Sequence, residues 1–188
     1  MKRMLTTVLI LTLTIFVGSP VFAGWDPADE DKKEYKNSKM DKKVQEAIET
    51  FKSKDSDLKR FFKKAHGYAI FPTVGKGGIG IGAAYGKGLV FEKGKAIGRV
   101  SLKQISYGFQ LGGQAYSQVI FFSDKAALDT FTDGNFEFGA GVSAVAITAG
   151  VSADTDYDDG VAVFTMAKGG LMYEASISGQ KFKYKPFK

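Results

Sequence analysis

The sequence predicts an α+β domain, mostly β, in which N-terminal amphipathic helices pack on a glycine-rich antiparallel sheet closed or nearly closed into a barrel. Apolar residues first recur at every third or fourth position and then, from Gly67 onward, at every second position, which indicates helices followed by strands. Most of the 23 glycines lie between Gly75 and Gly179, among short apolar segments joined by tight turns. Many short, closely spaced strands favour an antiparallel sheet that closes on itself.

Residues 1–37 precede this domain. Lys2 and Arg3 stand before an apolar run, Leu5 to Val17, which is shorter than the roughly 20 residues of a membrane-spanning helix. Small residues follow and end at Ala23, so we expect residues 1–23 to be a cleaved signal peptide rather than an uncleaved anchor. Residues 24–37 are polar and predict a lead-in without a core. The mature chain is therefore expected to be exported, periplasmic or secreted, with one domain over residues 38–188.

Two helices are expected at the start of the domain. Ser38 is a suitable N-cap for the first of them, and a short interruption at residues 53–57 separates it from the second. The apolar positions are Met40, Val44, Ile48 and Phe51 in the first helix and Leu58, Phe61 and Phe62 in the second. The apolar side of the first helix can either cover the sheet or enter a membrane, and both alternatives stay open.

Proline, glycine and polar turns divide the β region. A first strand is expected to stop at Pro72, and Lys93-Gly94 is expected to join two later strands as a hairpin turn. Ser123 is expected to cap a short helix that Asp133-Gly134 ends. The predicted β segments are residues 68–71, 78–85, 89–92, 95–102, parts of 107–122, 136–147, 161–166, 170–177 and 182–184.

Several motifs are similar to catalytic or ligand-binding signatures, but none meets its structural requirement. Gly75 to Gly80 spells G-x-G-x-x-G, yet the residues after it continue as a strand, whereas the dinucleotide motif opens a helix. Asp154 to Asp159 lacks the glycine and glutamate of an EF-hand loop, which leaves a solvated turn or adventitious calcium binding as its alternatives. The chain has no cysteine, and its one histidine, His66, has no nucleophile motif beside it. We therefore expect no enzymatic activity, no cofactor and no metal site.

Charge is distributed unevenly along the chain. The formal net charge is +6, and it falls by two when Lys2 and Arg3 leave with the signal peptide. Between residues 75 and 103 the only acidic residue is Glu92, whereas between residues 124 and 159 the only basic residue is Lys125 and the acidic residues are Asp124, Asp129, Asp133, Glu137, Asp154, Asp156, Asp158 and Asp159. The first region therefore attracts anions and the second repels them. Export and the absence of an aromatic-basic RNP pattern argue against nucleic acid as a partner.

Four ordered stretches carry a resemblance to a known family. They are Gly67 to Pro72 with Lys76-Gly77-Gly78, Gly108 to Gln114, Phe136 to Gly141, and Lys168 to Leu171 with Gly179. Together they resemble the signature blocks of SYLF domains over about residues 40 to 184. The chain departs from the family pattern by its expected export signal and by having no SH3 or FYVE domain within its 188 residues.

The resemblance implies a non-enzymatic lipid-binding module, because SYLF proteins of eukaryotes bind phosphoinositides and anionic membranes through basic residues and an N-terminal helix. We expect peripheral binding to anionic phospholipid, and we do not expect actin, which some fungal members bind, as a partner of an exported chain. The alternatives are an envelope assembly protein that binds another protein through its sheet, and a hydrolase with an unrecognised carboxylate site. The expected headgroup-binding residues are Lys59, Arg60, Lys63, Lys64, Lys76, Lys87, Lys93, Lys95, Arg99 and Lys103.

Overall fold

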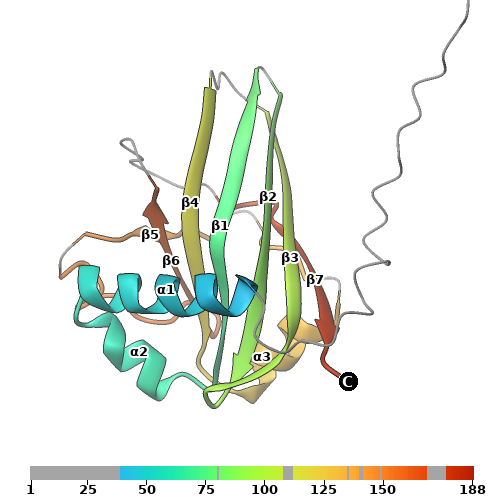
Figure 1. Ribbon diagram of the computed structural model, residues 1–188. Helices are drawn as coiled ribbons and strands as arrows, with labels where there is room; N and C mark the ends of the chain where they lie inside the picture. The colour runs from blue at the N-terminus through green and yellow to red at the C-terminus, as the bar shows by residue number, and fades with distance from the viewer. Residues whose placement is uncertain are drawn as a thin grey trace, which may run out of the picture. The chain divides into compact units, whose positions relative to one another are not determined.

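The computed structural model describes residues 39–79, 81–107, 112–134, 136–139, 142–148, 150–168 and 177–188. The predicted signal peptide, the lead-in, the Ser38 cap and most of the strand predicted at 170–177 lie outside the described residues. The elements, in chain order, are α1 (Lys39–Lys54), α2 (Leu58–Lys64), β1 (Gly67–Ile79), β2 (Ile81–Glu92), β3 (Lys95–Tyr107), β4 (Gly112–Phe122), α3 (Lys125–Thr132), β5 (Val145–Ala146), β6 (Val161–Ala167) and β7 (Lys181–Pro186) (Figure 1).

The strands form one sheet in the order β5-β6-β4-β1-β2-β3-β7. Every neighbouring pair is antiparallel except β5 and β6, which run parallel, so the sheet is mixed. The prediction of a mostly β fold with helices is confirmed. The prediction of a closed or nearly closed barrel is wrong, because the sheet ends at two separate edges, β5 and β7.

Backbone hydrogen bonds at the β7 edge explain why the sheet stays open. The segment around Phe138 pairs beside β7: the Phe138 N–H donates to the Gln180 carbonyl, and the Phe182 N–H donates to the Phe136 carbonyl. Backbone groups that would have to pair with β5 in a closed barrel are therefore already satisfied by this segment. Among the described residues of the strand predicted at 136–147, only β5 is regular sheet and Glu137 forms an isolated bridge to Lys181, so most of that prediction is wrong.

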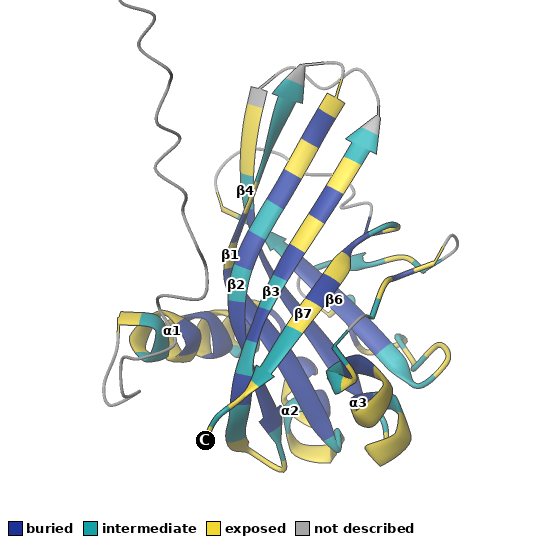
Figure 2. Ribbon diagram, turned by 90° about the vertical axis from the view of Figure 1, so that its right-hand side faces the viewer, coloured by how far each residue is buried: buried dark blue, intermediate teal, exposed yellow. Residues whose placement is uncertain are grey.

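Helices cover both faces of the sheet (Figure 2). α1 and α2 pack on one face, which we call the helical face, where the Phe61 ring lies 5.0 Å from that of Phe164 in β6. Val44, Ile48 and Phe51 of α1 are buried, so the structure decides that this apolar side covers the sheet instead of remaining available to a membrane. Among the residues that the structure describes, no helix is both long and apolar enough to span a bilayer.

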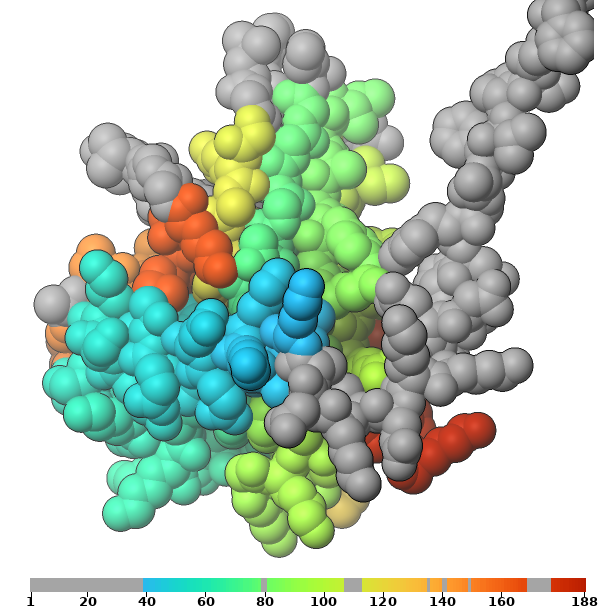
Figure 3. Space-filling view, in the orientation of Figure 1, coloured from blue at the N-terminus to red at the C-terminus, as the bar shows by residue number. Residues whose placement is uncertain are grey.

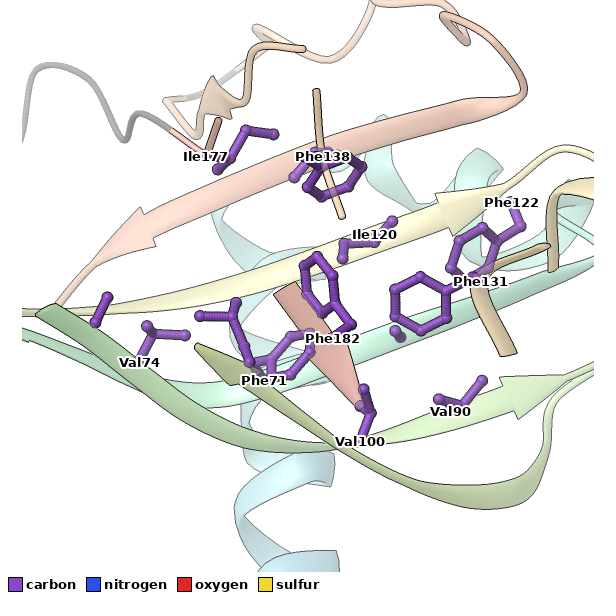
Figure 4. Close-up of a cluster of buried hydrophobic side chains, with 14 of the residues drawn as sticks. Phe71, Val74, Val90, Val100, Ile120, Phe122, Phe131, Phe138, Ile177 and Phe182 are labelled. Carbon is purple, nitrogen blue, oxygen red and sulfur yellow. The ribbon is translucent and has the colours of Figure 1, made fainter. Parts of the chain in front are cut away.

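The opposite face of the sheet carries the main core. Leu128 and Phe131 of α3 pack there with side chains from most of the strands. Figure 4 shows Phe182 of β7 between Phe131 and Phe71, and its ring centroid lies 5.1 Å and 5.8 Å from those two rings. β7 is thereby held against the middle of the sheet although it is an edge strand.

β1 continues through Pro72, so the prediction that a strand stops there is wrong. The register of β1 shifts between Ile70 and Thr73 against β2 and between Phe71 and Val74 against β4, and this bulge accommodates a residue without an N–H. Ser117 Oγ of β4 donates to the Pro72 carbonyl at 2.8 Å. Beside the bulge, a Cβ on Gly88 would lie 2.1 Å from the Ile70 carbonyl oxygen, so only glycine fits between the two backbones.

The turn predictions are largely confirmed. Lys93 and Gly94 both have positive φ, 48° and 79°, as a two-residue hairpin between β2 and β3 requires. Asp124, and not the predicted Ser123, caps α3: its Oδ1 accepts the Ala127 N–H at 2.9 Å. A carboxylate accepts more strongly than a hydroxyl at the positive end of a helix, and Ser123 Oγ donates to Asp124 instead.

Candidate functional site

The predicted headgroup-binding residues do not form one cluster. Four of them, Lys59, Arg60, Lys63 and Lys64, belong to α2, while Lys93 and Lys95 lie at the turn between β2 and β3. Lys87, Arg99 and Lys103 lie on β2 and β3, and Lys76 lies on β1. Strand pairing therefore decides on which face of the sheet the last four of these side chains lie.

Strand register places Lys87, Arg99 and Lys103 on the helical face. Lys87 is opposite Ser101, and Ser101 is two residues from both Arg99 and Lys103, so the three basic side chains project to the same side. Their neighbours of opposite parity, Val100 and Leu102, are buried in the main core.

β7 adds three lysines to this surface that the sequence analysis missed. Lys181 is directly opposite Lys103, Lys183 is opposite Ser101, and Lys185 is opposite Arg99. We call the six residues Lys87, Arg99, Lys103, Lys181, Lys183 and Lys185 the basic face. The alternation of lysine with Phe182 and Tyr184 in the tail could have revealed it, because alternate residues of a strand share one face.

The charge balance of the strands is strongly one-sided. The seven strands hold eight basic residues and one acidic residue, Glu92. Glu92 lies at the turn end of β2, where its Oε1 is 3.0 Å from His66 Nε2. Beside the basic face itself, Glu137 Oε2 lies 3.2 Å from Lys181 Nζ. The basic face therefore attracts anions over three adjacent strands.

Lys76 is separated from this surface. It pairs with Ala84 of β2 and Gln114 of β4, which places its side chain on the main-core side of the sheet. Lys76 is half-buried, and burial lowers the pKa of its amine. Its environment thus disfavours the charged form that headgroup binding would use.

A groove between α1 and the sheet continues the basic character of the helical face. It has a volume of about 450 Å³, and lysines from α1 and from the end of β6 line it. Lys168 Nζ donates to Thr73 Oγ1 of β1 at 2.9 Å, so this lysine lies across the sheet surface. Figure 3 shows the end of β6, in orange-red, beside α1 and β1. The lining lysines are Lys43, Lys54 and Lys168, and Glu46 is also present.

Arg60 donates hydrogen bonds to the loop of residues 150–160, which we call the acidic loop, and is not part of the basic face. Its Nη2 lies within 2.7 to 2.8 Å of three carbonyl oxygens, those of Ser152, Ala153 and Thr155. Converging carbonyls are the ligands that a calcium loop would offer, and here they receive a guanidinium. Among the residues described, no group of three or more His, Cys, Asp or Glu side chains is placed to hold a metal ion.

Two buried tyrosines, Tyr68 and Tyr116, have raised pKa values and contribute to packing. Burial raises the pKa of Tyr68 and of Tyr116 to about 12. Tyr68 stacks on Phe91 at 4.7 Å, and the Tyr116 hydroxyl accepts a hydrogen bond from Gln180 Nε2 at 3.1 Å. Burial thus keeps both phenols neutral at physiological pH.

Comparison with known proteins finds a family match in the strand region described above. Residues 103–185 match the Ysc84 family, described as "Las17-binding protein actin regulator". The chain is also 30% identical, over 165 residues, to beta cell expansion factor A of Aeromonas veronii, with 82% of this chain and 62% of that protein covered. Residues 103–185 belong to the Ysc84 (SYLF) family.

This assignment confirms the SYLF resemblance of the sequence. In this SYLF domain the family match begins in β3 and ends in β7, so it includes Lys103 and all three lysines of β7. The chain spans 62% of the length of the Aeromonas relative. Family membership therefore concerns the domain and does not by itself supply the activity or partners of the whole relative.

Proposed function

We propose that this SYLF domain is a non-enzymatic module that binds anionic phospholipid peripherally through its basic face. The observation that carries the proposal is the gathering of six basic side chains on one face of β2, β3 and β7, where Lys103 is opposite Lys181 and Glu137 offsets part of that charge. Like charges on adjacent strands repel one another, and bound anions reduce this repulsion. Phosphate headgroups are anions of this kind, and a face that spans three strands can meet several of them at once.

The expected strength fits reversible binding. Each lysine or arginine near an anionic membrane contributes about 1 kcal/mol, so six basic side chains can supply several kcal/mol. The contribution falls with ionic strength, because exposed charges are screened over a Debye length of roughly 10 Å at 0.1 M salt. The proposal therefore requires salt-sensitive binding.

Vesicle sedimentation with a pair of matched variants tests the proposal. The wild-type domain should sediment with phosphatidylglycerol vesicles at low salt, and phosphatidylcholine vesicles should leave it in solution. The double variant Lys103→Glu/Lys183→Glu should lose at least about tenfold in affinity, since it reverses two exposed charges of the basic face.

The matched control is Lys59→Glu/Lys63→Glu, which makes the same change in net charge on exposed positions of α2. It should retain most of the wild-type affinity. Equal losses in the two variants would show that net charge alone governs binding, and equal sedimentation with both lipids would refute the proposal.

We also propose that the chain reaches this membrane by export, with residues 1–23 removed. Mass spectrometry of the mature protein should give an N-terminus at Gly24. Actin, which appears in the family description, is not proposed as a partner, because an exported chain would not routinely meet it.

A further inference from the structure

The far end of the basic face carries an exposed apolar patch. Ile81 is 61% exposed and Ile105 is 68% exposed, and in the part of the chain that the structure describes these are the large apolar side chains left open to solvent. They lie at the ends of β2 and β3 that rise above α1 in Figure 1. Neither side chain contributes to the core.

Strand register gathers these residues on one side. Ala83, which is also exposed, is directly opposite Ile105, and Ile81 is two residues from Ala83 on the same face. Directly opposite residues in a sheet have Cβ atoms about 5 Å apart, and diagonal ones lie about 7 Å apart, within reach of long side chains. Ile81, Ala83 and Ile105 therefore form one patch, which we call the apolar tip.

The apolar tip shares its face with the basic residues. Lys103 is two residues before Ile105, which places it about 7 Å further down the same strand, and Tyr85 is directly opposite Lys103. The order along this face is thus apolar tip, then Tyr85 with Lys103, then Lys87 with Lys183. Tyrosine and lysine below an apolar end match the layers of a bilayer surface, in which polar headgroups cover hydrocarbon.

We propose that the apolar tip enters the boundary between headgroups and acyl chains of an anionic bilayer, while the basic face holds the headgroups beside it. This inference rests on the proposed function and adds to it the part of the domain that penetrates. A second copy of the chain is the competing occupant. Pairing two tips on this face would bring two basic faces together, and the repulsion of their charges opposes it.

Site-specific fluorescence tests the penetration. Because the chain has no cysteine, Ile105→Cys provides a single attachment site for an environment-sensitive dye. On phosphatidylglycerol vesicles the emission at position 105 should shift to the blue and should be quenched by lipids that carry a nitroxide near the headgroup. The control site, Thr130→Cys on an exposed position of α3, should show neither effect.

A double variant supplies an independent measurement. Ile81→Thr/Ile105→Thr keeps β-branched residues in both strands and should weaken vesicle binding about tenfold without changing its salt dependence. Lys103→Glu/Lys183→Glu should instead reduce the salt dependence. Circular dichroism should show wild-type structure for both variants, because all four positions are exposed.

The outcomes separate the two proposals. Wild-type sedimentation with an unquenched dye at position 105 would overturn penetration and leave peripheral binding intact, whereas no sedimentation of the wild type would remove both. A blue shift at position 105 that grows with protein concentration in the absence of vesicles, together with dimers in analytical ultracentrifugation, would assign the tip to a second copy of the chain and overturn the inference.

Discussion

At the scale of single residues, two oppositely charged side chains fasten the acidic loop to the helices. Asp55, 1% exposed, follows α1, and its two carboxylate oxygens accept the Ser152 N–H at 2.8 Å and the Asp57 N–H at 3.0 Å. Arg60 donates to three carbonyl groups of the same loop. The loop is thus held by the Asp55 carboxylate, which accepts, and by the Arg60 guanidinium, which donates. Both residues are more than 90 positions away from Ser152 in the sequence.

Replacing Asp55 should destabilise the fold. Asp55→Asn keeps the shape but weakens a charge-assisted hydrogen bond and turns an amide donor toward a backbone N–H, so we expect a loss of about 1–3 kcal/mol in the free energy of unfolding. Urea denaturation at neutral pH measures this loss. Asp57→Asn, on an exposed side chain with no capping hydrogen bond, is the control and should change stability little.

The effect of Asp55 should depend on pH. Burial opposes ionisation, but hydrogen bonds from Ser152 and Asp57 outweigh it and hold the pKa of Asp55 below its usual value of 3.8. A lowered folded-state pKa adds stability above the unfolded value, and that stability is lost as pH falls through the folded-state pKa. The stability difference between wild type and Asp55→Asn should therefore shrink below about pH 4. A difference that stays constant would contradict this role.

At the scale of elements, α1 shows how one pattern supports two functions until packing decides between them. Its spacing of apolar residues is typical both of a helix on a sheet and of a helix on a membrane. In the structure Val44 and Phe51 are 0% exposed and Ile48 is 4% exposed. A helix whose apolar side is buried in this way stabilises the domain and offers no apolar surface to lipid.

Ile48→Asp should therefore unfold the domain instead of only abolishing membrane binding. An unpaired carboxylate at a buried position costs on the order of 4 kcal/mol, a large part of the stability of a domain of this size. Gln45→Asp adds the same charge on an exposed position of α1 and is the control. Native circular dichroism and a wild-type urea midpoint for Ile48→Asp would disprove the core role.

At the scale of the whole molecule, an open sheet is held in shape by aromatic packing. Phe182 of β7 contacts the rings of Phe71, Phe131, Phe136 and Phe138, whose ring centroids lie 5.1 to 6.0 Å from its own. Among the named strands, β7 pairs with β3 alone, and these ring contacts hold it in place. The basic face depends on this packing, because three of its lysines lie on β7.

Phe182→Ala should weaken both stability and membrane binding. Removing a buried phenyl ring costs about 3–5 kcal/mol, and β7 is the element that loses support. Urea denaturation should report the loss of stability, and hydrogen exchange should show faster exchange in β7 than in β1. Sedimentation with phosphatidylglycerol vesicles should fall as β7 loosens. Unchanged exchange in β7 would show that its hydrogen bonds to β3 suffice to hold it.

Several features were predictable because they depend on neighbours in sequence. The helices, the Lys93-Gly94 turn and the end of α3 at Asp133-Gly134 all follow from spacing or local backbone geometry. The prediction at Pro72 was wrong because it considered local sequence alone: a bulge leaves Pro72 out of both ladders, and β1 goes on pairing with β2 and β4 after it. The candidate site was only half predicted, because strand register brings the lysines of β7 beside Lys103 from across about 80 residues.

The sequence by itself determined the family, the order of helices before strands and the excess of basic residues in the β region, since these are properties of residue type and local period. Only the tertiary structure decided that the sheet is open, that α1 belongs to the core and that six basic residues lie together below an apolar tip. Each of these depends on hydrogen bonds and side-chain contacts between segments far apart in the chain, and local patterns do not specify which segments will meet.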